Sequence, residues 1–232
     1  MIAKGPPAPP ALHNAHSVEV RRAANRDSAT LLWVVGPATL VVVLLAAIGH
    51  SGGHDWLPAL QYERRALAAG QLWRLLTAHL VHLDAWHAVL NLAGLGLLTG
   101  LFPRSYTPLE WLAVAVASAL AIDAGLWLGD PWVEWYVGLS GVLHGVLAAG
   151  AIAWWRAESR TFAALLSLIL TAKLAYEQTR GALPFSGSLP VVVDAHLYGA
   201  IGGAITAIAI IKLRRRSIDP PGPVDPGAGG PG

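Results

Sequence analysis

Long apolar stretches alternate with short polar connections along most of this chain. Six stretches are dominated by apolar residues, and Gly, Pro and most charged residues lie between them. A helix needs about 20 predominantly apolar residues to cross a bilayer. The pattern therefore predicts an all-α integral membrane protein with six transmembrane helices. The expected spans are Leu31–Ile48, Trp86–Phe102, Trp111–Leu128, Val137–Trp154, Phe162–Ala175 and Pro190–Ile211.

The composition supports lipid as the solvent of this chain. Of 232 residues, 54% are hydrophobic and only 13% are charged, with a mean hydropathy of +0.50, which argues against an ordinary soluble domain. Cysteine is absent, and this excludes disulfides, thiolate nucleophiles and Cys-ligated metals. The bilayer is thus an expected partner.

Three regions follow from the same pattern. Residues 1–30 are rich in Pro, Ala and Asn and predict a disordered basic lead-in, residues 31–213 form the membrane domain, and residues 214–232 form a basic, then Pro/Gly-rich, disordered tail. A cleaved signal peptide is the alternative for the first apolar run. This run is longer than the apolar core of a signal peptide, which usually has about 7–15 residues. Its length therefore favours a membrane span.

The distribution of charge predicts the orientation in the membrane. The net charge is +2, but the basic residues cluster at the two chain ends, which indicates topology and not nucleic-acid binding. Both termini are then cytoplasmic, and the loops at about 49–85, 129–136 and 176–189 face outward. Arg64, Arg65 and Arg74 in the first of these loops run against this rule.

Ser140 and His196 form the leading candidate for chemistry at membrane depth, where polar side chains are costly. Ser140 stands at the outer end of the fourth expected span, and His196 stands near the outer start of the sixth. A neighbouring imidazole can remove the hydroxyl proton of a serine as it attacks a carbonyl. Asp194, two residues before His196, should point away from it because two helical residues span about 200°. The prediction is therefore a Ser–His dyad.

Small residues on both helices would allow these two side chains to meet. Gly141 and Gly145 are four residues apart, as are Gly199 and Gly203. Such strips permit close approach of two helix backbones. The alternative is that these glycines serve helix packing alone.

His87 and Asn91 are candidates for an oxyanion hole. They are four residues apart and share one face near the outer end of the second expected span. With the backbone N–H of Ser140, their side chains can donate hydrogen bonds to the oxygen that becomes negative during acyl transfer. The alternative is that both merely satisfy loop carbonyls.

Other polar residues have weaker claims. His144, one turn after Ser140, would pack on the catalytic histidine, act as an alternative base or bond to a carbonyl. Asp123 and Lys173 are expected to be structural or interfacial. A metal site at His79, His82 and His87 is disfavoured because the chain lacks complementary ligand spacing, so neither a metal nor another cofactor is predicted.

The ordered set of motifs resembles the rhomboid family of intramembrane serine proteases over about Trp73–Gly203. The resemblance implies a six-helix core, a Ser140–His196 dyad, an oxyanion hole at His87 and Asn91, and a structural role for His82 in holding the outer loop by hydrogen bonds. Gly138, Gly141 and Gly199 fall in its motifs. The matching strings are Trp73-Arg74-Leu75-Leu76-Thr77, His82, His87, Asn91, Gly138-Leu139-Ser140-Gly141 and Ala195-His196-Leu197-Tyr198-Gly199.

One departure points to a branch of that family. Rhomboids commonly carry a tyrosine one turn after the serine, stacked on the catalytic histidine, where this chain has His144. This substitution and the small size resemble the rhombosortases, and place the usual stacking geometry in question. The resemblance implies processing of bacterial surface or secreted proteins that end in Gly-Gly, an apolar helix and a basic tail.

The sequence therefore predicts an intramembrane serine endopeptidase of the bacterial plasma (inner) membrane, with transmembrane protein substrates and cleavage near the outer face. A catalytically silent rhomboid-like protein that binds membrane helices is the alternative from another class. The presence of both Ser140 and His196 argues against this alternative. A transporter or metal protein is less favoured still.

Overall fold

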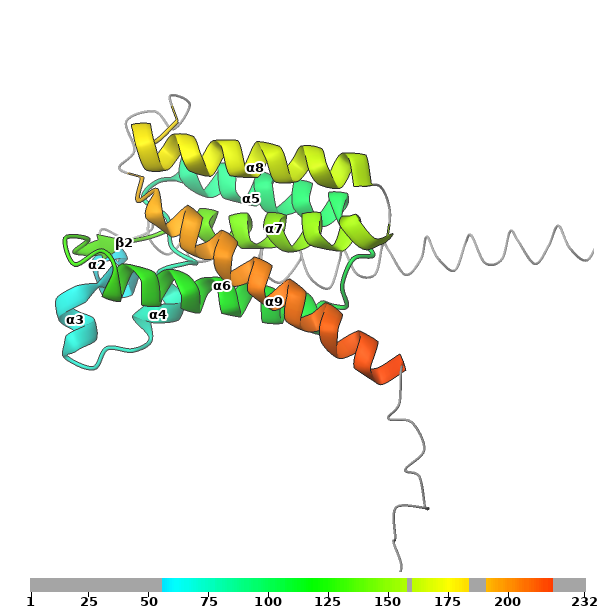
Figure 1. The fold of residues 1–232 in the computed structure, drawn as a ribbon. Helices are drawn as coiled ribbons and strands as arrows, with labels where there is room; N and C mark the ends of the chain where they lie inside the picture. Colours follow the sequence, from blue (N-terminus) through cyan, green and yellow to red (C-terminus); the bar gives the residue numbers. More distant parts are fainter. Residues whose placement is uncertain (1–55, 158–159, 184–190, 219–232) are drawn as a thin grey trace, which may run out of the picture.

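Five long helices make up the body of the computed structural model, which describes residues 56–157, 160–183 and 191–218. They run side by side as a bundle (Figure 1). The first expected span, the lead-in and the end of the tail lie outside the described residues. The helices are α5 (Ala85–Leu101), α6 (Pro108–Leu128), α7 (Ser140–Ala157), α8 (Arg160–Arg180) and α9 (Asp194–Ile218).

These helices coincide with five of the six predicted spans. By length and composition, two segments of the described chain can cross a membrane, Pro108–Leu128 and Asp194–Arg215, while Ala85–Leu101 and Ser140–Trp155 are shorter apolar helices. The all-helical architecture is thus confirmed, and the count of six spans stays a prediction. The fifth helix is longer than expected, since α8 continues five residues beyond Ala175 to Arg180.

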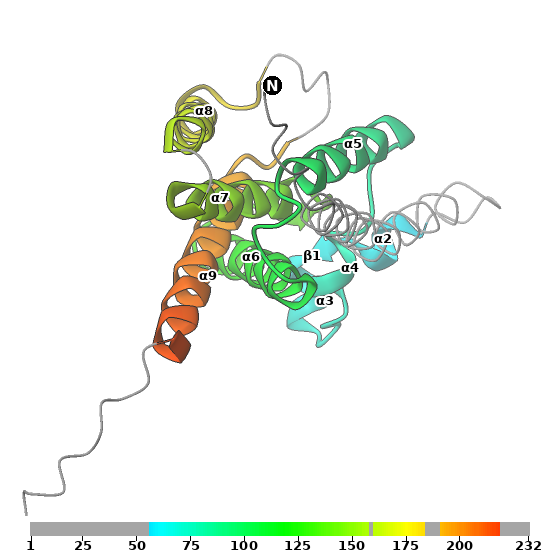
Figure 2. The same cartoon turned by 90° about the vertical axis from the view of Figure 1, so that its right-hand side faces the viewer.

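Helix α7 is the centre of the bundle. It packs against α5, α6, α8 and α9, and α9 also lies along α6, as the two orthogonal views show (Figures 1 and 2). A central helix can bury small and polar side chains that the outer helices would expose to lipid. Large apolar side chains such as Leu97, Leu120 and Ile205 are exposed on the outer helices, as expected for surfaces that face acyl chains.

Short elements cover one end of the bundle, which the sequence predicts only as loops at about 49–85 and 129–136. They lie at the end where α7 and α9 begin (Figure 1). Tyr62 pairs with Tyr136 in an antiparallel bridge, and both side chains are buried. Elements this brief leave no periodic signal in the sequence. They are α2 (Leu57–Leu60), β1 (Tyr62–Glu63), α3 (Arg64–Ala68), α4 (Arg74–Thr77) and β2 (Trp135–Tyr136).

Two arginines that oppose the predicted orientation have structural partners at this end. Arg64 donates to the carbonyls of Trp127 (3.1 Å) and Asp130 (3.0 Å), where α6 ends. Arg74 is 5% exposed and donates to the carbonyls of Pro58 and Gln61, both at 2.7 Å. Because unpaired carbonyls are costly to bury, these arginines are accounted for by the fold. They are therefore weaker evidence against the predicted membrane orientation than exposed arginines without such partners would be.

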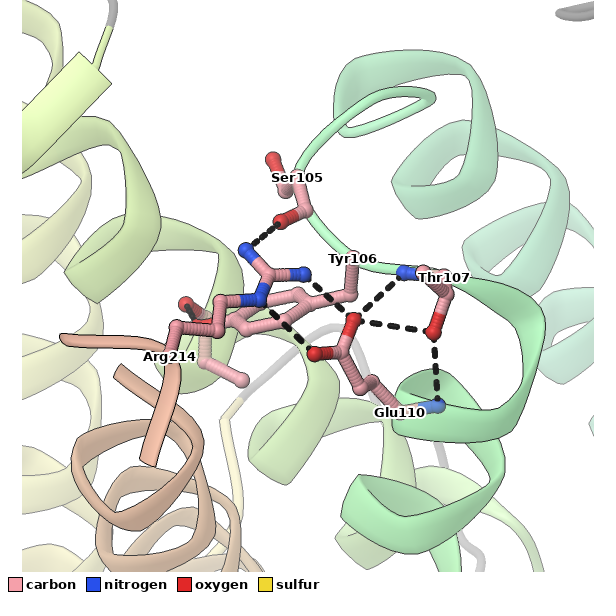
Figure 3. A network of polar contacts seen from close by, with 6 residues as sticks. Ser105, Tyr106, Thr107, Glu110 and Arg214 are labelled. Atoms are coloured by element: carbon pink, nitrogen blue, oxygen red, sulfur yellow. Dashed lines mark hydrogen bonds and ion pairs between the residues drawn. The ribbon is translucent and has the colours of Figure 1, made fainter. Parts of the chain in front are cut away.

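The opposite end is fastened by a polar network around Glu110 (Figure 3). Thr107 and Glu110 form a capping box at the start of α6, which satisfies backbone donors that a helix start leaves free. Glu110 also pairs with Arg214 near the end of α9. The Tyr106 hydroxyl donates to the Ala149 carbonyl of α7 at 3.0 Å. Three helices are thereby joined far from Ser140.

Candidate active site

The segment before Ser140 is fixed by hydrogen bonds on both sides. Gly138 donates its N–H to the Ala78 carbonyl at 2.9 Å, and its own carbonyl accepts from the Tyr136 hydroxyl at 2.7 Å. Gly138 has φ +114°, a backbone conformation that a side chain would strain. This explains a glycine two residues before the serine and places Ser140 at the first turn of α7.

Ser140 and His196 meet as the sequence predicts. The Ser140 Oγ and the His196 Nε2 are 3.0 Å apart, within the range for a hydroxyl and an imidazole to share a proton. His196 is 6% exposed, whereas Ser140 is only partly buried. The Ser140 hydroxyl is therefore partly accessible, while the His196 imidazole is shielded. A helix leaves its first N–H groups without intrahelical acceptors, so the Ser140 N–H is available as a donor at the same place.

Backbone contact between α7 and α9 makes this distance possible. A Cβ at Gly199 would overlap the Gly141 carbonyl, and a Cβ at Gly203 would overlap the Gly145 carbonyl. The predicted glycine strips are confirmed as the helix contact. Their position directly beside Ser140 and His196 means that helix packing sets the geometry of the site.

His87 and Asn91 converge on Gly138, on the side of Ser140 that faces α5. A Cβ at Gly138 would lie 3.0 Å from the His87 Nε2 and 3.9 Å from the Asn91 Nδ2. Asn91 is 4% exposed, and its Nδ2 has no hydrogen-bond partner among the described residues. A buried amide without an acceptor costs about 1–3 kcal/mol, so a donor held free in this way is suited to an oxygen supplied by a ligand.

His82 lies behind His87. It is 8% exposed, and its ring meets the His87 ring edge-on with centroids 4.9 Å apart. Burial lowers the pKa of His82 to about 4, with a further contribution from His87. The imidazole is therefore neutral at pH 7 and supports His87 by packing. Both His82 ring nitrogens are buried without a partner at hydrogen-bonding geometry among the described residues, so the loop hydrogen bonds expected from the resemblance are not seen there.

His144 stacks on His196. The ring centroids are 4.2 Å apart and the planes differ by 18°. His144 therefore stacks on His196 in the way expected of the tyrosine that rhomboids commonly have at this position. The His144 Nδ1 lies 2.7 Å from the Ser140 carbonyl oxygen. Since a carbonyl only accepts, the His144 Nδ1 carries the proton. Of the three roles expected for His144, packing and carbonyl bonding are both present.

Sequence reasoning missed Glu177. Its Oε2 lies 2.9 Å from the His196 Nδ1, and the Lys173 Nζ lies 2.6 Å from the same oxygen. Glu177 falls just beyond the expected end of the fifth span at Ala175, which assigned it to a loop, whereas α8 continues through it. Lys173 is next to the site and not merely interfacial. The available signal was the i, i+4 spacing of the two charges on a helix of the membrane domain.

Metal-ligand groups gather at a different place from the one weighed in the sequence. Within the described ranges, His144, Glu177 and His196 have ligand atoms within 4.8 Å of one another. The Lys173 ammonium bound to Glu177 and the bonded Nδ1 of His144 make this donor set unsuited to a cation. His79 instead lies 3.4 Å from the Asp123 Oδ1 in the core, which gives Asp123 the structural place expected for it.

Comparison with known protein families identifies the family of this chain. The Rhomboid domain matches residues 69–213, more than half of the chain. The protein therefore belongs to the rhomboid family, whose members are generally intramembrane serine proteases that act on transmembrane substrates within the bilayer. It is accordingly a membrane protein. No match is found among curated proteins.

Proposed function

We propose that this protein is an active intramembrane serine endopeptidase in which Ser140 is the nucleophile and His196 is the general base. The observation that carries the proposal is the 3.0 Å contact between the Ser140 Oγ and the His196 Nε2. A silent rhomboid-like binding protein would not need this contact. The Ser140–His196 contact and the Asn91 amide without a hydrogen-bond partner among the described residues both favour a protease over a protein that only binds helices.

The first half of the reaction forms an acyl-enzyme. His196 takes the hydroxyl proton at Nε2 while the Ser140 Oγ bonds to the carbonyl carbon of the substrate. The carbonyl oxygen becomes negative and accepts hydrogen bonds from His87, Asn91 and the Ser140 N–H. The C–N bond then breaks, and His196 returns its proton to the leaving amine.

The second half repeats these steps with an acceptor in place of the amine. The oxygen of a water molecule bonds to the acyl carbon while His196 removes a proton from that water, and the carbon–Oγ bond then breaks to release the new carboxyl end. Ser140 recovers its proton from His196. In a transfer reaction, an amine or other nucleophile would take the place of this water.

The proposed substrate is a single-span protein with Gly-Gly, an apolar helix and a basic tail, as in the rhombosortase branch. A bond must leave the helix to reach Ser140, but unsatisfied backbone groups in lipid cost several kcal/mol. Glycine lowers that barrier because it disfavours helix by about 0.8–1.0 kcal/mol relative to Ala. His144 at the branch-defining position supports this assignment.

The proposed location is the bacterial plasma (inner) membrane, with both termini cytoplasmic and Ser140 near the outer face. The end of α9 carries Lys212, Arg214 and Arg215, opposite the end where α7 begins (Figure 1). Basic residues favour the cytoplasmic side. Reporter fusions at the N-terminus and after Arg216 should both report cytoplasm, and a fusion near Gly129–Trp132 should report the outer side.

Covalent labelling tests the catalytic proposal. A fluorophosphonate should label the purified wild-type protein, and Ser140→Ala and His196→Ala should each abolish labelling and cleavage. Ser167→Ala is the control, because this serine lies on α8 and bonds to Trp155 away from the site. Cleavage that survives Ser140→Ala would refute the assignment, and a folded wild type that never labels would favour the silent binding protein.

A reporter pair tests the substrate. One reporter carries Gly-Gly, a helix and a basic tail, and its partner has both glycines changed to Val. Selective cleavage of the first supports the rhombosortase branch. Equal cleavage of both would reject that branch while leaving a general rhomboid protease.

A further inference from the structure

Glu177 is placed to control the proton on His196. It is 3% exposed and comes from α8, whereas Ser140 comes from α7 and His196 from α9. Its Oε2 lies 2.9 Å from the His196 Nδ1, on the side of the ring away from the serine. Three separate helices thus supply a carboxylate, an imidazole and a hydroxyl, which follow one another along a chain of hydrogen bonds.

The two possible positions of the imidazole proton have opposite consequences. A carboxylate only accepts, so its contact with the Nδ1 requires a proton there. The Nε2 is then free to accept the proton of Ser140. With the proton on Nε2 instead, the imidazole would donate to Ser140 and could not act as its base.

Lys173 offers the competing contact. Its Nζ lies 3.4 Å from the His196 Nδ1, and an ammonium can only donate. That contact would require an unprotonated Nδ1, which is the inactive form. The carboxylate contact is shorter by 0.5 Å (3.4 minus 2.9 Å), and the Lys173 Nζ lies only 2.6 Å from Glu177, so the lysine is engaged by Glu177.

We propose that Glu177 is a positioning residue that holds His196 in its active tautomer, and that Lys173 holds Glu177 in place. The proposal rests on the proposed function of Ser140 and His196. It extends the predicted dyad to a Ser140–His196–Glu177 relay of hydrogen bonds, in which the carboxylate also stabilises the imidazolium formed during attack. Glu177 itself neither touches substrate nor needs to change its protonation state.

The test compares variants that preserve shape. In Glu177→Gln, Lys173 draws the amide oxygen, and the amide nitrogen donates to the His196 Nδ1. This selects the inactive tautomer, so the maximum labelling rate by fluorophosphonate should fall by up to about 10⁴-fold, the loss known for an orienting Asp changed to Asn. The fluorophosphonate concentration for half-maximal rate should stay unchanged. Lys173→Met should lose less, because the carboxylate remains. Gln178→Ala, exposed on the next position of α8, is the control.

Nitrogen NMR of ¹⁵N-histidine-labelled protein supplies a readout that a packing role would not move. The wild-type His196 signal, assigned by its loss in His196→Ala, should show a proton on Nδ1, and Glu177→Gln should move it to Nε2. A wild-type proton on Nε2 would overturn the proposal, even if Glu177→Gln fails to fold. Equal labelling rates for wild type and Glu177→Gln would overturn it as well, as would a larger loss for Lys173→Met.

These outcomes are separable from failure of the proposed function. If wild type neither labels nor cleaves, the protease assignment fails, and the nitrogen spectrum still decides whether Glu177 sets the tautomer. If wild type labels normally and Glu177→Gln matches it, the protease stands as a dyad enzyme and only the role of Glu177 is lost.

Discussion

The substitution Gly199→Ala should damage the site through the helix contact, without removing any functional group. A Cβ at Gly199 would lie 2.6 Å from the Gly141 carbonyl carbon and closer still to its oxygen, whereas real Cβ atoms essentially never approach within 3.0 Å. The obstructing atoms are backbone, so no side chain can rotate away. Because the oxygen is the nearer atom, helices α7 and α9 must separate by more than the 0.4 Å (3.0 minus 2.6 Å) that the carbon alone requires.

That separation acts on the Ser140–His196 contact, which spans the same two helices. The contact is 3.0 Å, and the useful range for such a pair ends near about 3.2 Å. A displacement approaching 1 Å at a reacting group costs about 10²-fold in rate, and overpacking costs about 1–3 kcal/mol of stability. We expect a labelling rate reduced by about 10²-fold in a protein that still folds with a lower unfolding temperature.

The assay measures fluorophosphonate labelling and thermal unfolding of the same detergent preparation. Gly96→Ala is the matched control, because a Cβ at this helical glycine of α5 meets nothing within 4 Å. It should label as wild type and be at least as stable, since Ala favours helix over Gly. Wild-type labelling by Gly199→Ala would refute the view that backbone contact sets the catalytic distance.

Three further predictions address separate parts of the molecule. Asn91→Ala should lower the turnover number by about 10²–10³-fold with little change in KM, as loss of an oxyanion donor does; a change in KM alone would return Asn91 to a structural role. The pKa of His82 is about 4 in the fold and about 6.5 in an unfolded chain. The unfolded chain thus binds more protons, so acidification from about pH 6.5 to 4 should remove as much as about 3 kcal/mol of stability. Unfolding temperatures across this window should fall less in His82→Phe, and equal slopes would contradict the burial argument. Glu110→Gln should cost about 1 kcal/mol through the lost charge on the cap and the ion pair yet leave labelling unchanged, because α6 begins and α9 ends at the end of the bundle opposite the start of α7 (Figure 1). Slower labelling would contradict that separation.

The sequence predicted this fold well because lipid imposes a strong pattern. Apolar runs long enough to cross the bilayer stand out from the connections, and five of the expected spans coincide with α5 to α9. The sequence does not predict the short elements at the end of the bundle where α7 and α9 begin. The strands β1 and β2 have two residues each, and their pairing joins positions far apart in the chain.

Much of the site could also be predicted from the sequence, because several of its residues are spaced by four positions on the same helix and so share one helix face. His87 and Asn91 share a face of α5, and the glycine strips of α7 and α9 announce close contact. Because a polar side chain is costly in lipid, the few polar residues in the expected spans are the main candidates for function. The sequence alone therefore pairs Ser140 with His196, and the structure places the Ser140 Oγ 3.0 Å from the His196 Nε2.

Glu177 required the tertiary structure. Periodicity gives the face of each helix but not its rotation against its neighbours, and hydropathy ends a span where charges begin. Here α8 continues past its apolar run, and the polar turn at its end reaches His196 on α9. A charged residue that finds partners across helices looks, in sequence, the same as one in a loop. Packing alone decided that this carboxylate faces His196, because the imidazole comes from α9, whereas the ammonium of Lys173 lies one turn earlier on α8 itself.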